Sequence, residues 1–119
     1  MNRNRLIADA KEKAIELAEA GYTRPVQRKD IRVLGKQGLG IVYAGANSML
    51  AGNYISEHDK KISGKLGYVL CGGDLSSPAL VSEQYLLDLE REAFLSLCGE
   101  RKTLERIRSI LTSGKTLRN

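Results

Sequence analysis

The only histidine of the chain, His58, is the first candidate for chemistry, because an imidazole beside carboxylates is a frequent general acid–base group. It lies between Glu57 and Asp59 and two residues after Ser56. Consecutive residues of a helix point about 100° apart, so neighbours in sequence do not form a dyad. The pattern favours a surface histidine in the first turn of a helix over a catalytic group.

A glycine-rich stretch from Gly35 to Gly40 is the second candidate, because such loops can hold phosphate groups. Its spacing matches neither the GxGxxG fingerprint nor the phosphate loop that ends in Gly-Lys-Ser/Thr, and no clear strand precedes it. The stretch is more typical of a flexible lead into the following helix.

Thiols and carboxylates give no further site. Cys71 and Cys98 form no CxxC pair, and both lie at apolar helix ends, where reduced, buried thiols are expected. Asp88, Glu90 and Glu92 are spaced two apart, which on a helix does not make them converge. We therefore predict no catalytic residue and no metal site in this chain.

The charge balance is moderately basic, with 19 Lys and Arg against 14 Asp and Glu and a formal net charge of +5. The basic residues near the carboxyl end are Arg101, Lys102, Arg106, Arg108, Lys115 and Arg118. Cations there stabilise a helix C-terminus, and they also suit the phosphates of a nucleotide-like ligand. We do not expect nucleic acid as a partner, because no predicted helix has a focused basic and Asn/Gln face.

Apolar spacing predicts an all-α chain, with about five helices packed as a small irregular bundle in a single domain, residues 1–119. Aromatic residues make up only 5% of the sequence, so the core must be aliphatic. The expected helices cover about residues 4–20, 39–51, 56–71, 82–98 and 101–112.

Local signals refine these helices. Ser56 and Ser82 are good N-cap residues for the third and fourth helices. The fourth helix has the widest apolar face, which predicts a central position. The second helix carries small residues that predict a close-packed face: Gly40, Ala44, Gly45, Ala46 and Ser48.

Residues 22–37 form a basic connector in which Pro25 prevents a helix. Ile31, Val33 and Leu34 favour a short extended piece. The length of this connector suggests that it lies against another part of a larger protein. We see no leader segment and no apolar run near the ~18 residues of a membrane span, so we expect a cytoplasmic protein.

Several motifs together resemble one family. They span Ala20 to Pro25, Ile55 to Ile62, Val69 to Asp74, Val81 to Leu95 and Gly114 to Asn119. They look like the C-terminus of bacterial multifunctional 3-hydroxyacyl-CoA dehydrogenases of fatty-acid β-oxidation. In those proteins a dehydrogenase portion precedes an enoyl-CoA hydratase portion of crotonase type.

The segment from Leu86 to Lys115 also resembles the last two helices of crotonases. There the closing helix approaches the adenine end of coenzyme A and carries a Phe and, three residues later, a Lys. Aligned by Lys115, those positions here hold Ile110 and Ser113. The resemblance therefore leaves Lys115 as the candidate contact to coenzyme A.

The resemblance implies a non-catalytic C-terminal helical portion of an NAD-dependent parent enzyme, with packing against the rest of the polypeptide or a second subunit as its role. NAD and a coenzyme A thioester are implied for the parent, and no cofactor for this segment itself, which we expect to be inactive alone. Two alternatives stay open: a small basic nucleic-acid-binding protein, and a free-standing adaptor domain.

Overall fold

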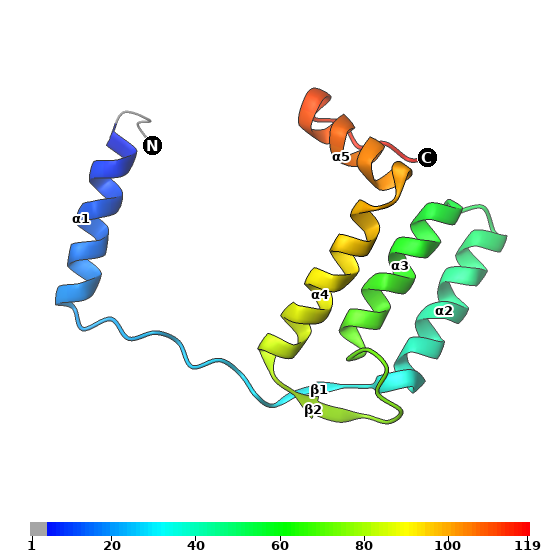
Figure 1. The fold of residues 1–119 in the computed structure, drawn as a ribbon, viewed down its shortest axis with the longest axis horizontal. Coiled ribbons are helices and arrows are strands. Elements are labelled where there is room, and N and C mark those ends of the chain that lie inside the picture. Colours follow the sequence, from blue (N-terminus) through cyan, green and yellow to red (C-terminus); the bar gives the residue numbers. More distant parts are fainter. Residues whose placement is uncertain (1–4) are drawn as a thin grey trace.

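The computed structural model describes residues 5–119. Its elements, in chain order, are α1 (Leu6–Glu19), β1 (Ile31–Val33), α2 (Gly35–Ala51), α3 (Glu57–Leu70), β2 (Ala79–Val81), α4 (Glu83–Cys98) and α5 (Arg101–Ser113). Figure 1 shows α2, α3 and α4 as one layer of neighbouring helices, with α5 at one end and the strands at the other. The all-α fold class is confirmed, since the two short strands are the only other regular elements among these residues.

The middle helix of the layer is α3, which packs against α2 on one side and α4 on the other (Figure 1). The prediction that residues 82–98 form the central helix is wrong. In α4 only Ala93 is buried, whereas Phe94 is 56% and Leu95 64% exposed. The wide apolar face of α4 therefore exceeds what α3 covers within this chain.

Glycines of α3 allow α2 and α3 to approach closely. A Cβ added to Gly67 would lie 2.6 Å from a methyl carbon of Val42, and one on Gly64 would lie 3.2 Å from the ring of Tyr43. The close-packed face expected on α2 is only partly present. Ala46 is buried, but a Cβ on Gly40 or Gly45 would meet nothing within 4 Å.

Helix α2 begins at Gly35, four residues before the predicted start, so the glycine-rich stretch from Gly35 to Gly40 forms its first six residues and the prediction of a flexible lead is wrong. Gly35 has a φ of +60°, and its N–H donates to the carbonyl of Cys71 at 2.9 Å. A Cβ there would lie 2.6 Å from the carbonyl oxygen of Leu75. Glycine at this position is required by both backbone conformation and space.

The two strands form an antiparallel pair in which Ile31 faces Val81 and Val33 faces Ala79. The expected extended piece is thus present at residues 31–33, but its partner strand, Ala79–Val81, lies between the predicted helices 56–71 and 82–98, where no strand was expected. Val33 is almost fully buried, and a Cβ on Gly72 would lie 2.6 Å from its methyl group. This packing fixes the base of the helical layer.

Both predicted serine caps are confirmed. The Ser56 hydroxyl accepts a hydrogen bond from the N–H of Asp59 at 3.2 Å, and the Asp59 carboxylate accepts one from the N–H of Ser56 at 3.0 Å. This reciprocal arrangement is a capping box. The Ser82 hydroxyl accepts from the N–H of Tyr85 at 3.1 Å.

Helix α1 stands apart from the other helices at the end of an extended connector (Figure 1). None of its residues is buried, and residues 21–30 of the connector are exposed throughout. The bundle itself is therefore built by α2 to α5. Among residues 5–119, no helix combines the length and the apolar character that a membrane crossing needs.

Candidate functional site

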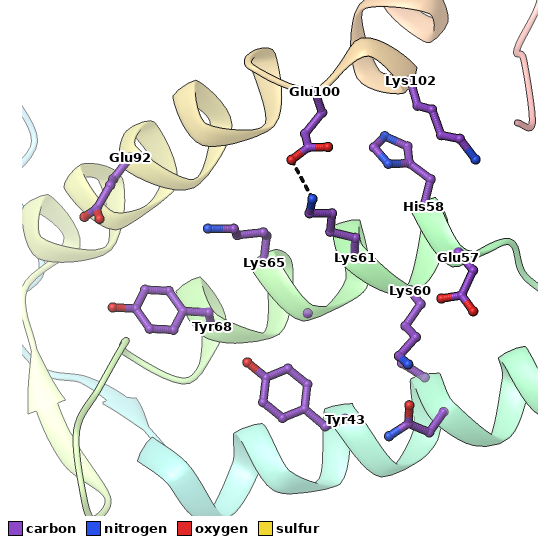
Figure 2. A pocket seen from close by; sticks show the side chains of 13 residues that line it. Tyr43, Glu57, His58, Lys60, Lys61, Lys65, Tyr68, Glu92, Glu100 and Lys102 are labelled. Carbon is purple, nitrogen blue, oxygen red and sulfur yellow. Dashed lines mark hydrogen bonds and ion pairs between the residues drawn. The ribbon is translucent and has the colours of Figure 1, made fainter.

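A groove with a volume of about 890 Å³ runs along α3, between α2 and the junction of α4 with α5. Figure 2 shows side chains from all four helices around this space. The residues that line it are Tyr43, Ala46, Asn47, Glu57, His58, Lys60, Lys61, Gly64, Lys65, Tyr68, Glu92, Glu100 and Lys102.

His58 lies at one end of the groove and is only 4% exposed. The prediction of a surface histidine is therefore wrong. The first turn of α5 covers α3 at this point, and His58 Nε2 lies 2.9 Å from the hydroxyl oxygen of Thr103. Burial, assisted by the positive charge of Arg106, lowers the pKa of His58 below 6.5, so the imidazole is neutral at pH 7.

The neighbouring carboxylates do not form a catalytic pair with His58. The hydrogen bond of His58 within residues 5–119 is to Thr103, and Asp59 points to other partners. A neutral histidine bonded to a threonine hydroxyl fixes the packing of α3 against α5. The sequence offered no signal for it, because the two residues are 45 positions apart.

A second contact between α3 and α5 is built around Arg106. Its Nη1 donates to Asp59 at 2.6 Å, and its Nε donates to the side-chain oxygen of Asn119 at 2.8 Å. Asn119 Nδ2 in turn donates to Glu105 at 2.8 Å. The backbone N–H of Ser56, followed by the Arg106 side chain, lowers the pKa of Asp59 to about 2. This half-buried network joins the chain end to the start of α3.

The groove is rich in lysine. Lys61 is paired with Glu100, and the hydrogen bond from Lys61 lowers the pKa of that carboxyl. The ammonium groups of Lys60, Lys65 and Lys102 form no ion pair within residues 5–119. Lys60 and Lys65 are also partly buried.

Two tyrosines complete the groove. Burial, together with the carboxylates of Asp74 and Glu92, raises the pKa of Tyr68, so its hydroxyl stays protonated. Tyr43 reaches the same space from α2 (Figure 2). Apart from Lys102, these lysines and tyrosines were not singled out from the sequence, because helical spacing alone does not show which residues of α2, α3 and α5 meet.

The structure does not bring the predicted basic carboxyl-terminal residues together at this groove. Lys115, the candidate coenzyme A contact, is exposed beyond the end of α5, and its backbone carbonyl accepts from Ser109 at 2.8 Å. Ile110 is half-exposed, and the Ser113 hydroxyl donates to the carbonyl of Ser109. Of the basic residues named at that end, Lys102 lines the groove.

The remaining predicted groups lie apart from one another. Cys71 is buried and Cys98 half-buried, and both are free thiols. Asp88 pairs with Arg91 along α4, whereas Glu92 lines the groove. No cluster of three potential metal ligands occurs in the part of the chain that the structure describes.

Large apolar side chains remain on the outside of every helix. Ile7 in α1 is 85% exposed and Leu111 in α5 is 80% exposed. On α4, Phe94 and Leu87 border a shallow depression of about 270 Å³ with Glu90 and Arg91. Exposed apolar surface on this scale is typical of a protein that packs against something else.

A curated dehydrogenase matches the chain along its whole length. The chain is 45% identical over 119 residues to a probable 3-hydroxyacyl-CoA dehydrogenase of Bacillus subtilis (strain 168). It covers 15% of the length of that protein, so the similarity supports a fragment of such an enzyme. No protein-family profile and no solved structure matches the chain.

Proposed function

We propose that this chain is the non-catalytic, carboxyl-terminal helical portion of a fatty-acid β-oxidation enzyme, an NAD-dependent 3-hydroxyacyl-CoA dehydrogenase. Its role is to pack against the remainder of the parent polypeptide or a second subunit. The observation that carries the proposal is the 45% identity, over all 119 residues, to part of a probable 3-hydroxyacyl-CoA dehydrogenase.

The exposed apolar side chains support a packing role. Phe94, Leu95 and Leu111 are each more than half exposed, although they lie on helices of the bundle, α4 and α5. Each such side chain stabilises an interface by roughly 1.5–3 kcal/mol when fully buried. A partner that covers α4 and α5 would therefore bind mainly through these residues.

The arrangement of titratable groups supports the absence of turnover in this portion. His58 is held neutral by burial, and the hydrogen bond that it forms within residues 5–119 is to the hydroxyl of Thr103 and not to a carboxylate that would orient it as a general base. We propose that hydride transfer to NAD, and hydration of enoyl-CoA where the parent has a hydratase portion, take place in the preceding part of the polypeptide.

The test is to produce the parent enzyme without this segment and to add the segment back as a separate chain. We expect the two parts to associate and the mixture to recover 3-hydroxyacyl-CoA-dependent NADH formation, with no turnover by the segment alone. Turnover by the segment alone, or full activity and stability of the truncated parent, would contradict the proposal.

A surface variant makes the test specific. Phe94→Ser should weaken association by about ten-fold or more while the segment keeps its own fold, because this side chain is 56% exposed in the isolated chain. The matched control is Glu90→Gln on the same face of α4, which should change affinity less than two-fold or so. Association that Phe94→Ser leaves unchanged would place the interface elsewhere.

The complete parent enzyme and the separate segment also allow tests of coenzyme A contact by Lys115 and of nucleic-acid binding. Lys115→Gln in the complete parent should raise the KM for the acyl-CoA if this lysine lies at the rim of the coenzyme A site, and leave it unchanged if not. Binding of DNA or RNA that weakens steeply with salt would instead favour the nucleic-acid alternative.

A further inference from the structure

Helix α5 is attached to the other helices mainly through polar contacts. Thr103 is the only buried residue of Arg101–Ser113. Three of the four large apolar side chains of this helix, Leu104, Ile110 and Leu111, are at least half exposed. Burial of apolar surface therefore contributes little to the docking of α5. Its attachment depends instead on a small set of hydrogen bonds and ion pairs.

These polar contacts join the start of α3 to the start of α5. We call them the α3–α5 clasp, and its members are His58 with Thr103 at 2.9 Å, Asp59 with Arg106 at 2.6 Å, and Lys61 with Glu100. Side chains of residues 107–113 form no hydrogen bond or ion pair with α2, α3 or α4. The clasp is therefore confined to one end of α5, and the remainder of the helix projects beyond it.

The connection between α4 and α5 is short enough to act as a hinge. Only Gly99 and Glu100 separate the two helices. Glu100 has an extended backbone, with φ −94° and ψ 124°, and its side chain does not cap α5. Rotation at such residues redirects a helix without breaking its internal hydrogen bonds. Figure 1 shows α5 joined to the layer at the end of α4, so that a rotation at this point moves α5 alone.

His58 is the member of the clasp with a side chain that ordinarily titrates near neutral pH. It is buried, and Figure 2 shows its ring between Glu100 and Lys102. The charged groups around the ring are Arg106 and Lys102 of α5, Glu100 before that helix, and Glu57, Asp59 and Lys61 of α3. The same groove is also lined by Tyr43 and Asn47 from α2 and by Glu92 from α4.

The closed clasp disfavours a proton on His58. Burial and the positive charge of Arg106 lower the pKa of His58 below 6.5, whereas Glu100 acts in the opposite direction and is already paired with Lys61. Once α5 moves away, the imidazole regains water and its ordinary pKa. As the pH falls below 6.5, the ratio of open to closed clasp therefore rises by up to roughly ten-fold per pH unit, until the closed form also takes up the proton.

The two ion pairs of the clasp keep their charges over this pH range. The N–H of Ser56, followed by the Arg106 side chain, holds the pKa of Asp59 at about 2. The hydrogen bond from Lys61 lowers the pKa of Glu100. Both carboxylates therefore stay ionised between pH 7 and 5, and His58 is the member of the clasp that changes charge there.

We propose that α5 is released from α3 at acidic pH: uptake of a proton by His58 opens the clasp, and α5 rotates about Gly99 and Glu100 while α2, α3 and α4 keep their packing. Release withdraws Glu100 and Lys102 from one end of the groove along α3 and exposes His58. This conformational change goes beyond the proposed packing role. It takes place in the 119-residue chain whether or not a parent enzyme is present.

The experiment measures the orientation of α5 relative to the other helices in the full 119-residue chain, by residual dipolar couplings of backbone amides at pH 7.5 and pH 5. At pH 7.5 a single alignment should fit α2 to α5. At pH 5 the couplings of α5 should fall to about half or less, because the helix reorients freely, and those of α2, α3 and α4 should stay the same. The ring signals of His58, the only histidine, report its protonation in the same samples.

Side-chain variants identify the group that controls the release. His58→Gln cannot take up a proton, so α5 should stay aligned at pH 5. Two variants with the same charge change are compared at pH 7.5. Arg106→Gln loses the contact to Asp59 and should free α5, whereas Arg108→Gln, on the exposed face, should leave it aligned. If His58→Gln itself frees α5 at pH 7.5, the unmodified chain decides, because the midpoint of the His58 ring titration must coincide with the loss of the α5 couplings.

Three results would overturn the proposal. The first is a set of α5 couplings that is the same at pH 7.5 and pH 5. The second is a loss of couplings in α2, α3 and α4 together with α5, which would indicate unfolding of the whole bundle. The third is the same pH response in His58→Gln, or a ring midpoint that differs from that of the couplings, since another group would then control α5. None of these results depends on whether the segment associates with a truncated parent.

Discussion

Asp59 accepts hydrogen bonds from Ser56 and Arg106, and these contacts hold the pKa of its carboxyl at about 2, against 3.8 when unfolded. Because the folded value is the lower one, the contribution to stability is complete above pH 3.8 and is lost as the pH falls through 2. The difference corresponds to about 2 kcal/mol at neutral pH. It is therefore the largest pH-dependent interaction that we expect for α3 and α5.

The first prediction concerns this carboxyl. Asp59→Asn should lower the free energy of unfolding at pH 7 by about 1–2 kcal/mol and flatten its dependence on pH between 2 and 4. Urea unfolding at several pH values measures both. The control is Glu16→Gln, which removes an exposed ion pair with Lys13 and should change stability by less than about 0.5 kcal/mol. An unchanged acid profile in Asp59→Asn would contradict the role of this contact.

The second prediction concerns His58, whose pKa is lowered from 6.5 mainly by burial. The unfolded chain therefore binds the proton more readily, and stability is lost as the pH falls through the range below 6.5. His58→Gln should remove that loss, so that its unfolding free energy varies less between pH 7.5 and 5 than that of the unmodified chain. A steeper dependence in the variant would show that the histidine is charged in the folded state.

At the residue scale, the sequence was informative where an interaction is local. Ser56 and Ser82 act within three residues, and both caps were predictable. The burial of His58 was not predictable from the sequence, because it depends on Thr103, which follows α4 and lies 45 positions later in the chain. Lys60, Lys61 and Lys65 of the groove were missed for the same reason.

At the scale of elements, the glycines of α2 and α3 differ in what surrounds them. Gly67 touches Val42, whereas the space beside Gly45 is open. A glycine inside a helix costs about 1 kcal/mol relative to alanine, so its replacement stabilises the helix where space allows. Where the glycine touches a neighbouring helix, the same replacement destabilises the protein, because the added Cβ has no space.

The third prediction uses this contrast. Gly45→Ala should raise the free energy of unfolding of the isolated chain by up to about 1 kcal/mol. Gly67→Ala should lower it by about 1–3 kcal/mol, since the added Cβ would lie 2.6 Å from Val42. Chemical denaturation of both variants under identical conditions is the measurement. Destabilisation by Gly45→Ala would indicate that this face is already in contact.

Helix boundaries were predictable wherever a cap or glycine marks the end, as at Gly99 and Gly114. The start of α2 was not, because Gly35 begins the helix through contacts with Cys71 and Leu75, which follow α3. The strand pair was missed because each strand has only three residues, too few for an alternating pattern.

At the scale of the whole molecule, α1 and the remaining helices behave as separate parts. No residue of α1 is buried, and the connector between Gly21 and Asp30 is exposed. Sequence patterns predicted that α1 is a helix, but they do not tell which surface an amphipathic helix covers. The open position of α1 agrees with the proposal that part of the binding surface belongs to another polypeptide segment.

The fourth prediction follows from this separation. Limited trypsin digestion should cleave after Lys29, which is exposed, rather than after Arg28, whose carbonyl accepts a hydrogen bond from the N–H of Glu83, and should leave a fragment that begins at Asp30. A chain that starts at Gln27 should keep the urea midpoint of the complete chain within experimental error, as followed by circular dichroism. A clear drop in the midpoint would show that α1 stabilises the other helices.

The exposed connector has one further consequence. The nine residues from Tyr22 to Asp30 extend at most about 30 Å, so the carboxyl-terminal end of α1 stays within roughly that distance of the sheet. A tether of this length keeps a binding segment at an effective concentration in the millimolar range for any surface it can reach. Even a weak contact of Ile7 and its neighbours would then be occupied most of the time, without requiring high affinity of α1 itself.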